Sequence, residues 1–202
     1  YLRAVKALTN ELFGVSAKLL PGKTGRLTAE LELISERQPD LLVVLGDFSD
    51  QLDFLKASAN LNIPVFTGHT LADSRLPEWL NSKLASRVRV LTAYPLIVET
   101  EHPGNKLHQQ ILTEYAPQLS ANRWTLYGQA VAELMAEVLK RTGRSLSRQK
   151  AVIAAENINQ WQGKLLPPVL LDSRNHLALS SFRISQISPG KVNHLSEWID
   201  GR

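Results

Sequence analysis

Residues 41–50, LLVVLGDFSD, constrain the fold more than any other stretch of this chain. An unbroken apolar run that ends in Gly and small acidic residues predicts a strand covered on both faces in a parallel sheet. In open α/β sheets, ligands bind just beyond the carboxyl ends of such strands, so we expect a site near residues 46–50. A second, compatible interpretation is that Asp47, Ser49 or Asp50 caps the following helix by accepting its free N–H groups.

Strands and helices alternate around this stretch. The apolar spacing predicts helices over 1–13, 27–38, 51–60 and 77–84, and strands over 15–20, 41–45, 63–67 and 87–94. The last of these strands alternates polar and apolar residues, which indicates a place nearer the edge of the sheet. Short links between strands and helices favour a parallel sheet with right-handed crossovers, so the fold class is α/β with flanking helices.

The second half of the chain begins with an irregular segment over 96–105, a candidate crossing between two lobes. Helices are expected over 106–115, over 124–142 with Gly143 as terminator, and from a cap at Ser145 or Ser147 to about residue 159. Strands are expected over 177–187 and 191–199, joined by a Ser-Pro-Gly turn. In the long helix, a stripe with helical spacing predicts a core face: Tyr127, Val131, Leu134 and Val138, with Met135 and Leu139 beside it.

Composition excludes several classes of protein. The chain has 202 residues, 44% of them hydrophobic and 21% charged, which is ordinary for a globular protein with a core of its own. The net charge of +4 has no basic block, so nucleic-acid binding is not expected. The absence of Cys rules out disulfides and thiolate chemistry. No apolar run is long enough to predict membrane insertion, and no signal peptide is recognisable. Because the chain starts at Tyr1 and opens on a helical pattern, we expect that a segment was removed before it or that it is a piece of a longer protein.

Motifs for catalysis or cofactor binding are not found. Gly22-Lys23-Thr24 imitates the end of a Walker loop, but the earlier Gly is missing. The five His residues are dispersed without an HExxH pair, so we expect surface or loop roles for them and neither a metal nor a cofactor. No Gly-x-Ser-x-Gly elbow occurs, and pairs such as Asp47 and Asp50 carry little specificity for glycosidase chemistry.

Polar residues at the ends of two neighbouring strands predict a binding surface instead. Asp47, Phe48 and Ser49 follow one strand, and residues 67–70, including His69 and Thr70, follow the next. The carboxyl ends of parallel strands meet at one edge of the sheet, so these groups are expected side by side.

Aromatic residues near the presumed crossing extend this surface. Tyr94, with Trp124 and Tyr127, adds flat walls to a cleft that would suit a small polar ligand. The alternative for Trp124 and Tyr127 is core packing at the start of a helix.

The order of these pieces resembles the second part of type I periplasmic substrate-binding proteins, the group that includes leucine/isoleucine/valine-binding proteins of ABC transporters. The resemblance runs over nearly the whole chain, from the helix over 1–13 onwards. Five stretches carry it: the helix over 1–13, QPDLLVVLGDFSDQLDFLKASANLNIPVFTG over 38–68, RVRVLTAYP over 87–95, LYGQAVAELMAEVLKRTG over 126–143 and WQGKLLPPV over 161–169.

The resemblance implies two Rossmann-like lobes that close around a ligand by hinge motion. By that analogy, residues 1–93 form the carboxyl-side lobe, residues 94–160 return to the amino-side lobe, and residues 161–202 cross again and end in the terminal strands. Ligand-facing positions matched by the family pattern are Asp47, Phe48, Ser49, His69, Thr70 and, with them, Tyr127.

Two departures from the family pattern bear on the ligand. The first lobe, which in the family supplies groups that hold an amino-acid carboxylate, has no counterpart in this sequence. Amino-acid-binding members also often place an acid in the second loop, whereas here Gly68 is followed by His69. The ligand could therefore be an amino acid, a hydrophobic carboxylate, an amide or another small polar molecule.

The leading hypothesis is a non-enzymatic, periplasmic module that binds a small polar solute for an ABC uptake or sensing system. An ABC permease would be one partner, and a second copy or another chain would complete the first lobe. A second hypothesis is an α/β enzyme that uses Asp47 and His69 as an acid/base pair, although a third reacting group is not recognisable. A third is an interaction module without a ligand.

Overall fold

The computed structural model describes residues 27–73 and 75–200. The expected helix over 1–13, the strand over 15–20 and the Gly22-Lys23-Thr24 segment lie outside the described residues. The described elements are, in chain order, α2 (Leu27–Arg37), β1 (Leu42–Val44), α3 (Phe48–Ala57), β2 (Val65–Thr67), the 3₁₀ turn η1 (His69–Leu71), α4 (Leu76–Trp79), α5 (Ser82–Arg87), β3 (Val88–Thr92), α6 (Pro103–Tyr115), α7 (Arg123–Thr142), α8 (Arg148–Glu156), β4 (Ser181–Ser188), β5 (Lys191–His194) and β6 (Ile199–Asp200). None of the helices in these ranges is long and apolar enough to cross a membrane.

Three consecutive strands form the parallel part of the sheet. β1 pairs in parallel with β2, and β2 with β3, so that Leu42, Val65 and Val88 lie in register. Helices follow each of the first two strands, as the alternation in the sequence predicts. The expected α/β class is confirmed for this part of the chain.

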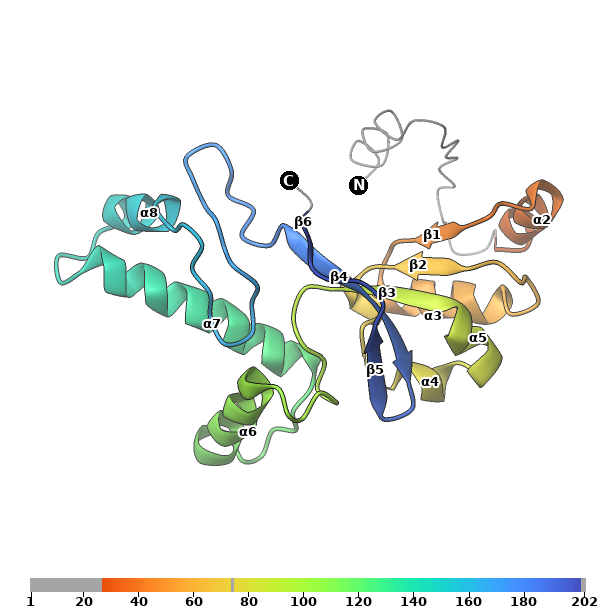
Figure 1. Cartoon of the computed structure of the whole chain (residues 1–202), viewed down its shortest axis with the longest axis horizontal. Coiled ribbons are helices and arrows are strands. Elements are labelled where there is room, and N and C mark those ends of the chain that lie inside the picture. Colours follow the sequence, from red (N-terminus) through yellow and green to blue (C-terminus); the bar gives the residue numbers. More distant parts are fainter. Residues whose placement is uncertain (1–26, 74, 201–202) are drawn as a thin grey trace.

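The terminal strands make the sheet mixed. β4 pairs antiparallel with β3, and β5 and β6 both pair antiparallel with β4. β3 therefore lies inside the sheet, and the prediction that it lies nearer an edge was wrong, because the tail returns to cover it (Figure 1). The described order begins instead at β1, whose Val43 is 65% exposed, so the prediction that this strand is covered on both faces was also wrong.

Helix ends in the second half follow local signals closely. The side chain of Asn122 caps α7, where it accepts from the backbone N–H groups of Trp124 and Thr125. Gly143 ends the same helix with a positive φ of 74°, a backbone conformation that glycine adopts without a steric penalty. The predicted cap of α8 is confirmed at Ser147, which accepts from the N–H of Lys150.

The described residues form two units side by side, each with its own hydrophobic cluster (Figure 1). The sheet unit contains β1 to β5 and α3 to α5, and its cluster includes the fully buried Leu55, Val65 and Val90. The helical unit contains α6, α7, α8 and the loop 157–180, and its cluster includes Leu126 and Val169.

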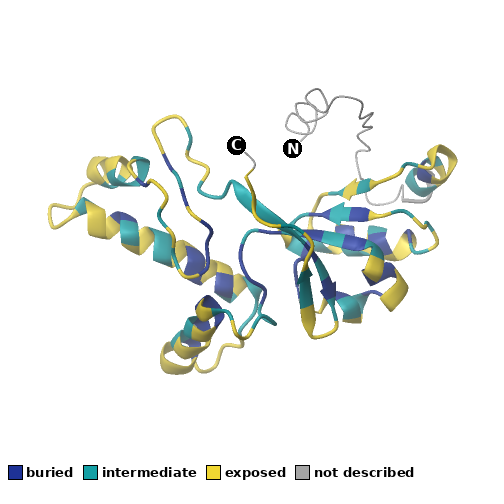
Figure 2. Cartoon of the chain, in the orientation of Figure 1, coloured by how far each residue is buried: buried dark blue, intermediate teal, exposed yellow. Residues whose placement is uncertain are grey.

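The predicted core face of α7 is only partly buried. Val138 is 7% exposed, but Tyr127, Val131 and Met135 are 43%, 46% and 53% exposed. The residues that α7 buries most deeply are Leu126 and Ala130, one turn apart. The helix thus has two apolar faces, and the described residues cover one of them, as the exposed residues along α7 in Figure 2 show.

A buried histidine joins two of these helices. His108 of α6 is 3% exposed, and its Nδ1 and Nε2 atoms lie 2.8 Å from Gln129 Oε1 and 2.9 Å from Thr125 Oγ1 of α7. The expectation that every His has a surface or loop role was therefore wrong for His108. Its signal in the sequence is weak because the polar partners lie 17 and 21 residues away.

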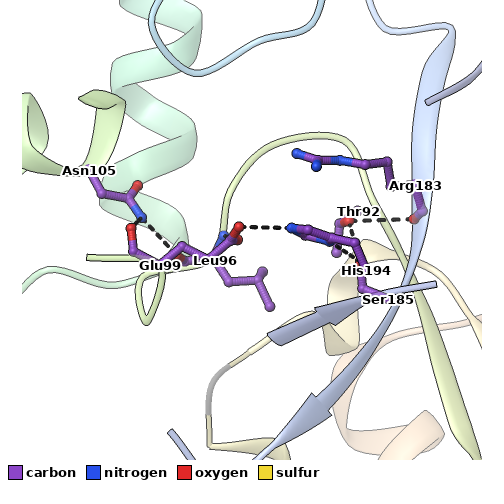
Figure 3. Close-up of polar contacts among 7 residues, drawn as sticks. All are labelled: Thr92, Leu96, Glu99, Asn105, Arg183, Ser185 and His194. Carbon is purple, nitrogen blue, oxygen red and sulfur yellow. Dashed lines mark hydrogen bonds and ion pairs between the residues drawn. The ribbon is translucent and has the colours of Figure 1, made fainter. Parts of the chain in front are cut away.

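A polar network ties the crossing segment to the sheet (Figure 3). The Nε2 of His194 lies 2.9 Å from Glu99 Oε1, and its Nδ1 lies 3.0 Å from Ser185 Oγ, which in turn contacts Thr92 Oγ1 at 3.0 Å. Glu99 also accepts from the backbone N–H of Leu96 at 2.6 Å. The residues that leave β3 are therefore fixed to β4 and β5, and the helical unit is attached to the sheet unit at a defined place.

Candidate functional site

The loops after β1 and β2 are held together by one buried side chain. Gln51 of α3 is 2% exposed, and its Nε2 donates to the carbonyl of Gly46 at 2.5 Å and to Thr70 Oγ1 at 2.6 Å. Its Oε1 accepts from the hydroxyl of Thr67, the last residue of β2. A buried amide with all these contacts sets the positions of both loops, so the two strand ends do meet as expected.

A cavity of about 650 Å³ opens beside these loops, between the two units. Its lining comes from the sheet unit, from the start of the crossing segment and from the start of α7. The lining residues are Phe48, Leu52, Ala72, Asp73, Arg75, Trp79, Tyr94, Pro95, Leu96, Ile97, Ser120, Ala121, Asn122, Arg123, Trp124 and Leu126. The volume suits a small-molecule ligand, and the walls are mostly apolar with a few polar groups.

A second cavity of similar size, about 660 Å³, lies against α6. None of the residues predicted for the site lines it, and it does not reach the loops after β1 and β2. We therefore take the cavity between the units as the candidate site.

Aromatic rings and guanidinium groups stack along one wall of this site. The rings of Phe48 and Trp79 meet edge to face with centroids 4.9 Å apart. Arg75 lies 4.9 Å from the centroid of Trp79, and Arg123 lies 4.7 Å from the centroids of both Phe48 and Trp124. Such cation–π contacts hold long side chains in place.

The charges of the wall are unequal. Asp73 is 6% exposed and forms an ion pair with Arg75, whose Nε lies 3.1 Å from Oδ1. Burial alone would raise the pKa of Asp73, but the hydrogen bonds and charge of Arg75, with the charge of Arg123, outweigh it and hold that pKa below its ordinary value. The pKa of His69 is lowered first by partial burial and then by the positive charge of Arg123, so its imidazole is neutral near pH 7.

Three of the predicted site residues, His69, Thr70 and Tyr94, lie around Arg123. The carbonyl of Thr70 accepts a hydrogen bond from Arg123 Nη1, and His69 is close enough to feel its charge. Tyr94 lines the cavity, and its ring centroid lies 6.2 Å from that of Tyr127, which borders the site without lining it. Burial raises the pKa of the Tyr94 hydroxyl, against the opposing charge of Arg123.

The three predicted residues after β1 are placed unequally. Phe48 lines the cavity, whereas Asp47 and Ser49 are exposed and do not. Asp47 occupies the N-cap position of α3, but its side chain accepts no hydrogen bond from the helix, so the capping interpretation was wrong for this carboxylate. No hydrogen bond or ion pair joins Asp47 to His69, both of which lie in the described part of the chain.

Sequence reasoning missed the charged part of the site. The charged residues Arg123, Asp73 and Arg75 line the cavity but were not predicted. Neither were Trp79, which also lines it, and Gln51, which joins the two loops, because single residues of these types in helices and loops carry no local signal. Trp124, considered as a wall or as core, lines the cavity and is 62% exposed, which contradicts core packing.

Metal binding finds no support in the described ranges. No group of three or more His, Asp or Glu side chains lies close enough together there to hold a metal ion. The described residues of the site form an apolar pocket with aromatic faces, the ion pair of Asp73 with Arg75, and the cation of Arg123.

The sequence and the fold of the chain were compared with those of known proteins. No family model matches the sequence, and neither does any curated protein. Solved structures do match. A possible leucine/isoleucine/valine-binding protein from Rhodopirellula baltica is 19% identical, with a TM-score of 0.67 over 83% of this chain and 45% of that one.

Two further matches cover more of this chain. A branched-chain amino acid ABC transporter protein from Thermus thermophilus with bound valine is 14% identical, with a TM-score of 0.72 over 90% of this chain and 52% of that one. A fatty acid ABC transporter substrate-binding protein from Thermomonospora curvata is also 14% identical, with a TM-score of 0.78 over 98% of this chain and 53% of that one.

The chain has the fold of type I periplasmic binding proteins. It spans about half the length of the type I periplasmic binding proteins that it matches. At these identities the likeness shows the fold alone. The resemblance seen in the sequence is confirmed at that level, and the role of the site is taken up below.

Proposed function

We propose that this chain binds a small polar solute, an amino acid or a related molecule, as part of the substrate-binding component of an ABC uptake system. The observation that carries the proposal is the cavity between the two units at the carboxyl ends of the strands, where ligands of open α/β sheets bind. The similar structures include a protein with bound valine and a fatty acid substrate-binding protein. The likeness to these solute-binding proteins supports a non-enzymatic role for this chain.

The proposal assigns the ligand contacts to the rim and wall of that cavity. Phe48 and Tyr94 line the cavity and would provide aromatic faces. Tyr127 would contribute from its border, and His69 and Thr70 would contribute from the loop after β2. Asp47 and Ser49, exposed at the first turn of α3, would reach a ligand only from the rim.

Location and partners are part of the same proposal. We place the protein in the periplasm, with an ABC permease as partner. The carboxyl-side lobe would comprise residues 1–93, residues 94–160 would belong to the amino-side lobe, and residues 161–202 would form a crossing segment and the terminal strands. The half of the fold without a counterpart in this chain would come from another segment or chain, and the exposed apolar face of α7 is consistent with such a cover.

The test is the melting temperature of the purified chain against a panel of amino acids, their deaminated carboxylic acids and the corresponding amides. A bound ligand stabilises the native state by about 2.7 kcal/mol at one hundred times its Kd, so a true ligand raises Tm by several degrees. Trp124→Ala, which removes an exposed ring from the cavity wall, should reduce that rise.

Trp198→Ala is the matched control, because Trp198 is 40% exposed and lies outside the cavity. It should leave the ligand-induced rise unchanged. Absence of a rise with every compound would contradict the proposal. Turnover of a compound that Asp47→Ala abolishes would favour an enzyme instead.

A further inference from the structure

Among the described residues that line the candidate cavity, Arg123 is a cation without a carboxylate bound to it. The side chain of Arg75 binds Asp73 through two contacts of 3.1 Å, one to each carboxylate oxygen, and its backbone N–H donates to Oδ1 at 3.0 Å. Among the lining residues that the structure describes, Asp73 is the only acid, and its carboxylate is bound to Arg75. Arg123 forms no ion pair within the part of the chain that the structure describes.

Arg123 is nevertheless held in position. Its guanidinium lies 4.7 Å from the ring centroids of Phe48 and Trp124, and one Nη1–H donates to the carbonyl of Thr70. Stacking uses the flat faces of a guanidinium, and its N–H donors lie in the plane at the edge. The other N–H donors of Arg123 have no partner among the described residues, so they are free to bind a ligand.

We propose that Arg123 binds the carboxylate of the ligand, and that this ligand has an apolar body and no ammonium group. A guanidinium pairs with a carboxylate through two parallel N–H···O bonds, the strongest polar contact that this wall can make. The apolar body would lie against Phe48, which contacts Arg123, and against Trp79, whose ring meets that of Phe48. The inference rests on the proposed function and narrows its ligand to one chemical class.

Three features of the wall work against an ammonium group. The carboxylate of Asp73 is already paired, so it offers no free charge to an ammonium. The fixed charge of Arg123 repels one. His69, which lies in the second loop, supplies no negative charge, because an imidazole is either neutral or cationic.

The experiment compares ligands that share one carbon skeleton. 3-Phenylpropanoate, phenylalanine and 3-phenylpropanamide form one set, and 4-methylpentanoate, leucine and 4-methylpentanamide form another. Binding of each compound to the purified chain is measured by isothermal titration calorimetry. We expect a carboxylate to bind about tenfold or more tightly than its amide, the size of one charge-assisted hydrogen bond. The amino acid should bind more weakly than the carboxylate.

Variants test whether Arg123 is the cause of that preference. Arg123→Gln should bring the carboxylate and the amide of a set to within about threefold of each other while amide binding stays unchanged. Arg123→Lys, which keeps the charge and loses the planar fork, should keep part of the preference. Arg148→Gln, at the start of α8 and outside the cavity, is the matched control and should keep all of it. Far-ultraviolet circular dichroism confirms that each variant is folded.

The outcomes separate this inference from the function on which it rests. Tighter binding of the amino acid or the amide than of the carboxylate, in the unsubstituted protein, would overturn the inference and leave the proposed function standing. So would an unchanged preference in Arg123→Gln. Failure of all six compounds to bind would overturn the inference, whereas the proposed function falls only if no compound of the melting panel raises Tm.

Discussion

The sheet unit and the helical unit differ in how completely they cover their apolar residues. In the sheet unit, α3, α4 and α5 pack with the strands around Leu55 and Val65, both fully buried. In the helical unit, Leu126 on one face of α7 is fully buried, whereas Val131 and Met135 on another face of the same helix are about half exposed. The third helix, α8, has no buried residue at all.

The difference shows what each kind of element needs. A strand in a sheet is stabilised by its neighbours, and helices on the sheet close the core. A helix with two apolar faces needs two partners, and the described residues supply one for α7. The candidate site lies between the sheet unit and the helical unit, so its geometry depends on both.

Three Leu→Ala substitutions test this contrast with the largest expected effect. Leu55→Ala in the sheet unit and Leu126→Ala on the buried face of α7 both remove a fully buried side chain. Each should lower the free energy of unfolding by about 2–5 kcal/mol. Leu139→Ala, on the face of α7 where that residue is 45% exposed, should change it by less than about 0.5 kcal/mol.

The measurement is unfolding in urea, with the slope of the transition checked for each variant. A large loss of stability in Leu139→Ala would contradict the comparison, because it would mean that the second face of α7 is covered in solution, for example by a second copy of the chain.

Two glycines in helices of the helical unit give a smaller, matched test. A Cβ on Gly104 of α6 would lie 2.5 Å from the carbonyl oxygen of Lys164 and from Leu165 Cδ2. Gly104→Ala should therefore lower stability by about 1–3 kcal/mol, because the loop 157–180 packs directly on this helix. A Cβ on Gly128 of α7 meets nothing within 4 Å. Gly128→Ala should raise stability by roughly 0.5–1 kcal/mol through helix propensity.

Thermal and urea unfolding measure both changes. If Gly104→Ala were as stable as the unsubstituted chain, the loop 157–180 would not pack on α6 as closely as described.

The smallest expected effect concerns the contact between the two units. Partial burial and then the charge of Arg123, which belongs to the helical unit, lower the pKa of His69 in the sheet unit. Arg123→Gln should raise that pKa toward 6.5, although not fully, because burial is the larger cause. Titration of the His69 imidazole signals by NMR measures the change.

The same shift predicts a weak dependence of stability on pH. Because the pKa of His69 is lower in the folded chain than in the unfolded one, the unfolded chain binds more protons below about pH 6.5. Stability is therefore retained above that pH and lost as the pH falls through the folded pKa. His69→Gln should lose less stability than the unsubstituted chain between pH 7 and pH 5, and an equal loss would argue against the shift.

Much of the fold is predictable because its signals are local. The alternation of strands and helices through Thr67, the stop at Gly143 and the cap at Ser147 each depend on a few adjacent residues. Of the candidate site, Phe48 and Tyr94 were predictable because they follow strands directly. The meeting of the loops after β1 and β2 follows from the parallel order of the strands.

The rest was decided by contacts between distant residues. The position of β3 inside the sheet depends on β4, whose residues pair with it more than 90 positions later. Which apolar face of α7 is buried depends on what packs against it, since both faces have helical spacing. Arg123 reaches Thr70 across 53 residues, and no local pattern marks that approach. The sequence determined the elements and their order because propensity and periodicity act over a few residues, whereas burial and charge pairing, which make the site, exist only once the chain has folded.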